Sequence, residues 1–558
     1  MPENKTFFYE PGKSLLTLLR EEGIFVESPC GGAGTCGKCR VILLSGERSL
    51  PRREEEQEKK AQEEKEQKEG AARDCLACRI FPSGDLTVEI SKRQKDELPL
   101  APHFSFSTEP MTEPMGAQPG RARSEKTART SIARTSLGLA VDIGTTTLEA
   151  TLADRETGEE LAARSALNPQ TRYGMDVLSR ISHVMAHPEG VREMQGLLTE
   201  KLNAMAEDLC REARVSSFSI DMAAVAANST MLHLLLGISP APLGVFPFTP
   251  AFLESREMPA REVGLTALGE HARLVCLPSV SAFIGADIVA GVRAAGLARE
   301  KGNVLFIDIG TNGEIVLSRQ GSLVSCSCAA GPALEGMNIG CGMRAEPGAI
   351  EDVSIDPQGV VRLRVIDGEV PVGICGSGIL AAIRELLRSG LLRRDGSLLT
   401  ETEVKEELPP ARWGLAALCR EENGVPAVSL WEDIVVTQKD VRQAQLAKGA
   451  LLSGSLALLN WAGLPVEDID KILVAGQFGA HLPVESLTGC GILPQGPSLA
   501  TGKVKYVGNA SKSGALMVLT SPSTLAEMDD LAHNIAYVEL GATPGYQELF
   551  MECLEFPA

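Results

Sequence analysis

Three cysteines lie close together among glycines near the N-terminus, at Cys30, Cys36 and Cys39. Their spacing is C-x5-C-x2-C, and thiolates grouped in this way are suited to holding an iron–sulfur cluster. The intervening glycines allow the backbone to fold tightly and to direct N–H groups toward the sulfurs. This pattern predicts a [2Fe–2S] cluster.

The fourth ligand of such a cluster must come from further along the chain, from Cys75 or Cys78. We predict Cys78, because it shortly precedes the next strand, whereas Cys75 comes one turn earlier and would be a spare. A zinc site with four thiolates is the competing interpretation. Zinc ribbons usually carry two CxxC pairs, which differs from the asymmetric spacing here.

A duplicated turn provides a second chemical signal. The segments 137–152 (LGLAVDIGTTTLEATL) and 304–317 (VLFIDIGTNGEIVL) each contain an apolar strand that ends in Asp-Ile-Gly-Thr, then a tight turn and a second strand. Small residues allow backbone N–H groups in such a turn to point at a phosphate, and hydroxyl groups add donors. The predicted phosphate contacts are Gly144, Thr145, Thr146, Gly310, Thr311 and Asn312.

Carboxylates accompany both turns. Asp142 and Asp308 end the two apolar strands, where each can hold Mg²⁺ directly or through water. Phosphoryl chemistry chiefly requires positioning and charge neutralisation, and two facing turns with a metal ion provide both. Glu314 and Asp287 are candidates for orienting the attacking water, although capping a helix is the common role for an aspartate placed like Asp287.

A third segment completes a nucleotide site. Residues 471–482 (KILVAGQFGAHL) resemble a strand followed by a glycine-rich turn, in which a nucleoside can lie close to the backbone. The turn consists of Gly476, Gln477, Phe478 and Gly479. The chain has no GxxxxGK[ST] loop, so the predicted site differs from a Walker A site. The three segments, taken in this order, predict ATP binding.

The elements that position these residues fall into several units. Residues 1–98 form one unit around the cysteine loop, and residues 99–136, which are rich in Pro, Ser, Thr and Arg, are predicted to be a flexible linker. From residue 137 onward strands and helices alternate. We predict two similar α/β halves, 137–300 and 301–558, that face each other across a ligand-binding cleft.

The composition limits the partners. The chain has 558 residues, a net charge of -19 and only 4% aromatic residues, which argues against nucleic acid and against an anionic membrane surface as partners. Neither a signal peptide nor an apolar run long enough to span a bilayer is visible. We therefore expect a cytoplasmic protein, in which 14 cysteines do not form a disulfide framework.

These motifs resemble those of known families. The cysteine unit is similar to adrenodoxin and plant-type ferredoxins, which implies a β-grasp fold. DIGTTT, DIGTNG and VAGQFG resemble the two phosphate motifs and the adenosine motif of the actin-like ATPase superfamily, which implies a duplicated ribonuclease H-like fold and makes 228–238 and 375–380 its connecting helices. The pairing of these domains, with AAGPALEGMNIGCGMRAEPGAI (329–350) between the motifs, resembles the reductive activators of corrinoid-dependent enzymes.

That last resemblance implies an ATPase that uses Mg²⁺ and ATP to drive one electron from a [2Fe–2S] cluster to a Co(II) corrinoid, giving Co(I) on a protein of a methyltransferase system. It also implies a low-potential electron donor and a homodimer. Some members carry a further middle domain, for which the sequence leaves no room after the linker. Two other functions stay open on the residues alone: a small-molecule kinase with a redox-sensing ferredoxin domain, and a nucleotide-gated redox regulatory module.

Overall fold

The computed structural model describes residues 13–21, 26, 39–49, 73–89, 136–422, 424–476, 482–496, 501–521 and 523–557. Of the predicted linker 99–136, all but residue 136 lies outside these residues. Three hydrophobic cores organise the described chain: a small one in the N-terminal unit and two larger ones that follow residue 136. None of the helices in this part of the chain is both long and apolar enough to cross a membrane.

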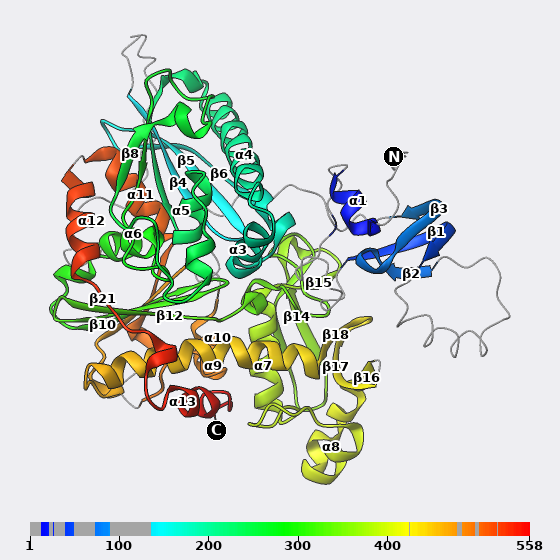
Figure 1. Cartoon of the computed structure of the whole chain (residues 1–558). Helices are drawn as coiled ribbons and strands as arrows, with labels where there is room; N and C mark the ends of the chain where they lie inside the picture. Colours follow the sequence, from blue (N-terminus) through cyan, green and yellow to red (C-terminus); the bar gives the residue numbers. More distant parts are fainter. Residues whose placement is uncertain are drawn as a thin grey trace, which may run out of the picture.

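The N-terminal unit is a three-stranded antiparallel sheet with the strand order β2-β1-β3, together with one helix (Figure 1). The apolar face of the helix packs Leu15, Leu16 and Leu19 against Val41 and Ile80. The elements are α1 (Leu15–Glu21), β1 (Arg40–Ser49), β2 (Arg73–Leu76) and β3 (Phe81–Glu89).

Two six-stranded sheets repeat one construction. In each, three strands form an antiparallel meander, and two parallel strands continue the sheet on the other side of the first strand. The first sheet contains β6 (Glu160–Leu167), β5 (Thr147–Asp154), β4 (Leu137–Ile143), β7 (Ile220–Ala227), β9 (Arg273–Cys276) and β8 (Arg256–Pro259). The second contains β20 (Val504–Gly508), β19 (Lys471–Ala475), β10 (Asn303–Ile309), β11 (Gly313–Arg319), β12 (Ser322–Cys328) and β21 (Ala536–Tyr537).

The central strands β4 and β10 are almost continuously apolar because helices cover both faces of their sheets. Helix α4 buries Met194, Leu198 and Leu202 against the first sheet, and α9 packs on β11 and β12 of the second. The helices of these layers are α3 (Val177–Ala186), α4 (Gly190–Ala213), α5 (Ser229–Leu235), α6 (Ala286–Ala294), α9 (Gln438–Trp461), α10 (Val484–Gly489) and α11 (Ala510–Thr520).

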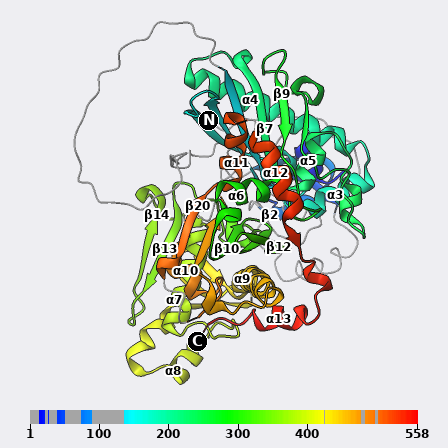
Figure 2. The same ribbon diagram turned by 90° about the vertical axis from the view of Figure 1, so that its left-hand side faces the viewer.

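Helices α6 and α11 join the two halves. Both views show α11 and α12 returning to the first half, and α11 contacts β4, β5 and β7 of the first sheet (Figures 1 and 2). Gly514 in α11 approaches α6 so closely that a Cβ would lie 2.4 Å from the Ala290 carbonyl oxygen. Residues near the C-terminus therefore help to form the first core, and the division at 300/301 stays a prediction.

An insertion between β12 and α9 builds two three-stranded sheets beside the second half (Figure 1), and the chain ends in three short elements. The insertion contains β13 (Ala349–Ile355), β14 (Val361–Val365), β15 (Gly373–Ile374), α7 (Gly376–Ser389), α8 (Glu401–Glu407), β16 (Cys419–Glu422), β17 (Val425–Trp431) and β18 (Ile434–Thr437). The last helices are α12 (Ser523–Asn534) and α13 (Tyr546–Glu552), and they flank β21.

Candidate functional site

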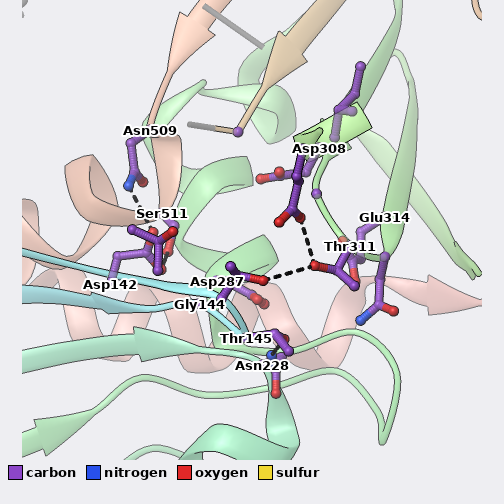
Figure 3. Close-up of a pocket in the computed structure, with 17 residues that line it drawn as sticks. Asp142, Gly144, Thr145, Asn228, Asp287, Asp308, Thr311, Glu314, Asn509 and Ser511 are labelled. Atoms are coloured by element: carbon purple, nitrogen blue, oxygen red, sulfur yellow. Dashed lines mark hydrogen bonds between the residues drawn. The ribbon is translucent and has the colours of Figure 1, made fainter. Parts of the chain in front are cut away.

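A cleft lies between the ends of β4 and β10, where the two Asp-Ile-Gly-Thr turns face each other (Figure 3). The structure brings most of the residues predicted for ATP and Mg²⁺ binding to this one place, while Gln477, Phe478 and Gly479 lie outside the described residues. The predicted residues that line the cleft are Asp142, Gly144, Thr145, Thr146, Asp287, Asp308, Gly310, Thr311, Asn312, Glu314 and Gly476. Their individual roles stay predictions.

A glycine N–H closes each of the two turns, and the first turn is one residue longer than the second. The Gly144 N–H donates a hydrogen bond to the Thr147 carbonyl oxygen at 2.9 Å, and the Gly310 N–H donates to the Asn312 carbonyl oxygen at 3.0 Å. A Cβ at Gly144 would lie 2.7 Å from that Thr147 oxygen, so a larger residue would open the turn. The hydroxyl oxygens of Thr146 and Thr311 lie 3.4 Å apart, one from each turn. An anion between the turns would therefore meet donors from both halves.

Five carboxyl groups line the cleft, with those of Glu314 and Glu335 buried and those of Asp142, Asp287 and Asp308 partly buried, and no lysine or arginine is among the described residues that line it. Burial, together with the negative charges of nearby Asp287 and Asp142, raises the pKa of Asp308 to about 8. Burial likewise raises the pKa of Asp287 to about 7 and that of Asp142 to about 6. Burial also raises the pKa of Glu314 well above its usual range. A divalent cation would relieve this mutual repulsion.

The donor set fits Mg²⁺, since it consists of hard carboxylate, hydroxyl and carbonyl oxygens. Within the described residues, no three His, Cys, Asp or Glu side chains converge closely enough to hold one metal ion by themselves. An ion here would complete its shell with water and phosphate oxygens, which is the usual arrangement for Mg²⁺.

Asn509 and Ser511, at the start of α11, hold Asp142 in place, and the sequence analysis missed both. The Asn509 amide donates to Asp142 Oδ2 and to Glu149 Oε2, each at 2.8 Å, and the Ser511 hydroxyl donates to Asp142 Oδ1 at 2.9 Å. The Lys512 ammonium pairs with Glu149 Oε1 at 2.9 Å. The only signal in the sequence is a strand followed by an asparagine N-cap, which says nothing about a partner 367 residues away.

Asn509→Asp is expected to reduce ATP hydrolysis about 10- to 100-fold and to lower the midpoint of thermal unfolding, because it replaces a shared donor by a third carboxylate beside Asp142 and Glu149. Steady-state phosphate release and a thermal melt would measure both effects. Asn460→Asp, on an exposed part of α9, is the matched control and should change neither. Equal behaviour of the two variants would contradict this assignment.

Asn228 and Arg180 support the first turn from two other elements. The Asn228 amide donates to Thr145 Oγ1 at 3.1 Å while its oxygen caps α5. The Arg180 guanidinium is fully buried and donates to the Thr145 carbonyl oxygen, to the Gly174 carbonyl oxygen at 3.0 Å and to Gln170 Oε1 at 3.3 Å. Burial lowers the pKa of Arg180 to about 9, so the group stays charged at neutral pH. A positive charge therefore lies beneath the turn predicted to bind phosphate.

Arg180→Met is expected to lower the free energy of unfolding by about 3 kcal/mol, because it leaves buried carbonyl acceptors without a donor. ATP affinity should fall roughly 10-fold as the charge beneath the first turn disappears. Denaturant unfolding and nucleotide titration would measure the two effects. Arg164→Met, at a half-exposed arginine paired with Glu212, serves as the control, and a match between the two variants would refute the supporting role.

In the N-terminal unit the structure describes two of the four predicted cluster ligands, Cys39 and Cys78, and both are buried. The Ala77 N–H donates to the Cys39 carbonyl oxygen at 2.6 Å, which places Cys78 beside Cys39. Cys75 lies instead within β2, paired with Val41. Cys30 and Cys36 lie outside the described residues. The juxtaposition of Cys39 and Cys78 fits a thiolate-held cluster, and the choice of Cys78 over Cys75 stays a prediction.

The duplicated sheets and the acidic cleft between paired turns define the larger part of the chain as an actin-like, or ASKHA, fold. Family models cover nearly all of the sequence: the 2Fe-2S iron-sulfur cluster binding domain matches residues 1–83, the RACo middle region matches 137–300, and the C-terminal ASKHA domain of RACo matches 302–558. The chain belongs to the RACo family, the reductive activators of corrinoid-dependent enzymes.

Individual relatives agree with this placement. The chain is 32% identical over 422 residues to "Corrinoid activation enzyme RamQ" of Eubacterium limosum, a match that covers 74% of this chain and 69% of the relative. It is 26% identical over 303 residues to "[Co(II) methylated amine-specific corrinoid protein] reductase" of Methanosarcina barkeri, covering 50% and 51% of the two chains. The solved structure of a "Reductive activator for corrinoid,iron-sulfur protein" aligns with a TM-score of 0.69 and 30% identity over 99% of this chain and 96% of that one.

These findings confirm the predicted fold class, a ferredoxin-type unit followed by a duplicated actin-like domain. They overturn one expectation. The segment 137–300 matches the family's middle region, so the expectation that the chain lacks such a region is wrong. That expectation failed because the first phosphate strand, β4, itself opens the segment that matches the middle region.

Proposed function

We propose that this protein is an ATP-dependent reductive activator, which transfers one electron to a Co(II) corrinoid bound to a partner protein of a methyltransferase system and so yields Co(I). The observation that carries the proposal is the presence, in one chain of this family, of a cysteine unit fit for a [2Fe–2S] cluster and a cleft fit for Mg-ATP. The names of two relatives, a corrinoid activation enzyme and a Co(II) corrinoid protein reductase, support the same substrate.

In this proposal, electron supply, phosphate binding, metal binding and orientation of the attacking water are assigned to different residues. A [2Fe–2S] cluster bound by Cys30, Cys36, Cys39 and Cys78 supplies single electrons. The hydroxyls and N–H groups of the two turns would bind phosphate, while Asp142 and Asp308 would hold Mg²⁺ directly or through water. Glu314 and Asp287 are placed in the same cleft to orient the attacking water.

Coupling to ATP follows from the energetics of the electron. A plant-type cluster has a reduction potential of about -400 mV. Each ~60 mV by which the potential of the cobalt acceptor lies below that of the cluster makes the one-electron step about 1.4 kcal/mol less favourable. A nucleotide can offset such a gap only by binding two states of the protein or of its complex with different affinity. The cleft is suited to binding two states with different affinity, because its hydrogen-bond donors come from both halves. The distance between those donors depends on the orientation of one half relative to the other.

Spectroscopy of the corrinoid tests the proposal. The full-length protein is purified anaerobically, reduced with a strong low-potential donor and mixed with a Co(II) corrinoid protein, and the optical spectrum is followed with and without Mg-ATP. We expect Co(I) to appear only with ATP. Co(I) formation that ignores ATP would refute the coupling, and a phosphorylated small product would favour the kinase alternative.

The proposal also includes a low-potential electron donor, a homodimer and a cytoplasmic location, with neither nucleic acid nor membrane as a partner. The acidic balance of the chain supports the last two exclusions.

A further inference from the structure

Glu335 is a buried carboxyl group that touches the two phosphate turns and that the sequence analysis did not select. Its side chain is 4% exposed and lines the cleft. Oε1 accepts a hydrogen bond from Thr311 Oγ1 at 2.6 Å, and Thr311 Oγ1 lies 3.4 Å from Thr146 Oγ1 of the opposite turn. Oε2 is buried without a hydrogen-bond partner among the described residues. One carboxyl group therefore sits where the two halves meet, with half of its hydrogen-bonding capacity unused.

The Thr311 hydroxyl can donate only one hydrogen bond, because it carries one hydrogen. At present Glu335 accepts that hydrogen bond. A phosphate bound between the turns would need the same hydrogen, and its negative charge would repel the neighbouring carboxylate. Phosphate binding and the present position of Glu335 therefore compete, and a bound nucleotide favours a different placement of this side chain.

The backbone that carries Glu335 is able to move as a hinged unit. Glu335 ends the short helix η7 (Pro332–Glu335), which lies between Gly331 at φ 72° and Gly336 at φ 75°. Left-handed glycines absorb backbone rotation at little steric cost. Helix η7 packs directly on the start of α7, where a Cβ at Gly376 would lie 1.8 Å from the Leu334 carbonyl oxygen.

The segment 336–347, which we call the cleft loop, is tied to itself and to two neighbouring elements. A Cβ at Gly336 would lie 2.2 Å from the Met343 carbonyl oxygen, so the backbone at Gly336 packs directly against the backbone at Met343. The Met343 N–H donates to the Ile374 carbonyl oxygen in β15 at 2.9 Å, and the Gly340 N–H donates to Asp440 Oδ1 at the start of α9 at 2.6 Å. A loop packed this closely moves between discrete arrangements and does not deform continuously.

The cleft loop reaches the surface at Gly340, Ala345 and Pro347, which are exposed. Arg344, between these positions, lies near enough to Glu335 to attract its carboxylate. Displacement of Glu335 would therefore change the electrostatic partner of Arg344 as well as the backbone at Gly336. The loop connects the phosphate turns to the exterior within a dozen residues.

We infer that Glu335 is a positioning residue that makes the arrangement of the cleft loop depend on whether a nucleotide phosphate lies between the two turns. This inference rests on the proposed function. It identifies the cleft loop as the element through which nucleotide binding at that site changes the protein surface. The Thr311 hydroxyl is the switched group, and Glu335 is the side chain that it holds or releases.

Hydrogen exchange of the cleft loop tests the inference on the full-length protein alone, without any corrinoid. In the wild type, Mg-ATP is expected to change amide exchange in 336–347 by about 10-fold, since it breaks the Thr311–Glu335 hydrogen bond. Glu335→Gln keeps the size and an acceptor but removes the charge. We expect it to lower the KM for ATP about 5-fold and to reduce the exchange response of the loop, because the repulsion between phosphate and carboxylate is gone while the competition for the Thr311 hydrogen remains.

Further variants separate the outcomes. Thr311→Ala, which lacks the donor, should remove the loop response, whereas Thr311→Ser should preserve it; these two keep the test available if Glu335→Gln does not fold. Glu351→Gln, on β13 outside the cleft, should behave as the wild type. An unchanged loop response in Glu335→Gln overturns the inference, and so does a fall in kcat with KM and loop exchange unchanged, which would make Glu335 a catalytic group only.

The corrinoid assay distinguishes this inference from the proposed function. If nucleotide changes the loop but Co(I) never forms with any corrinoid protein, the proposed function fails and the coupling by Glu335 stands. If Co(I) forms with ATP in the wild type and equally fast in Glu335→Gln, the proposed function stands and the coupling fails. We expect Co(I) formation in Glu335→Gln to slow at least 10-fold.

Discussion

Asp308→Asn is expected to slow ATP hydrolysis by a factor of roughly 10²–10⁴, because it removes a charge that we propose holds the metal ion against the phosphates. Steady-state phosphate release at saturating Mg-ATP measures the effect. Asp208→Asn, at an exposed aspartate whose partner is Arg211, is the matched control and should hydrolyse ATP at the wild-type rate. If the rate of ATP hydrolysis by Asp308→Asn lies within 3-fold of the control rate, Asp308 does not hold the metal ion.

The same substitution should stabilise the nucleotide-free protein. Burial and neighbouring carboxylates raise the pKa of Asp308 from 3.8 to about 8, so the folded state binds more protons than the unfolded state between these two values. Stability contributed at this position is therefore lost as pH rises from about 4 toward 8. We expect Asp308→Asn to raise the free energy of unfolding by about 2 kcal/mol or more at pH 8 and by less at pH 6.

Thermal unfolding of the two proteins at both pH values would measure this gain, with and without Mg-ATP. With Mg-ATP added, the wild type should unfold at a higher temperature than Asp308→Asn, since the wild type binds the ligand and is stabilised by it. A gain that is the same at pH 6 and pH 8 would contradict the raised pKa. Opposite effects on stability and activity are common where a site concentrates like charges for a ligand.

Cys78→Ser is expected to abolish the iron–sulfur cluster and with it corrinoid reduction, while ATP hydrolysis by the actin-like domain stays within about 2-fold. Serine offers a harder oxygen ligand in place of the soft thiolate that such clusters require. Iron and sulfide content after anaerobic purification, together with the visible absorption spectrum, measure cluster loss directly.

Cys75→Ser is the matched control, because Cys75 lies three residues away in β2 and is paired with Val41. It should retain iron, sulfide and Co(I) formation. The reverse result, with iron lost in Cys75→Ser and kept in Cys78→Ser, would show that the fourth ligand has been assigned to the wrong cysteine. Loss of iron in both variants would point to a folding defect of the unit, which a thermal melt of the oxidised protein would detect.

The sequence alone predicted the parts of this molecule that depend on neighbouring residues. The two Asp-Ile-Gly-Thr turns are each a strand, a turn and a strand in continuous sequence, so their internal hydrogen bonds and the phosphate binding predicted for them follow from a few adjacent residues. The duplication indicated two facing halves because repeated strand patterns favour repeated sheets. The cysteine spacing was informative for the same reason, since three of its four members share one loop.

The tertiary structure decided which distant side chains support those turns. Asn509 meets Asp142 only because α11 crosses to the first half, where Gly514 allows it to pack against α6. Arg180 approaches the first turn from a segment without a motif, and Glu335 approaches the second turn from the segment 329–350, whose sequence indicates a family but no contact. Local patterns specify what a turn can bind, because hydrogen bonds within it join near neighbours; the contacts that fix its charge and its mobility come from packing between remote segments, and no spacing along the chain encodes them.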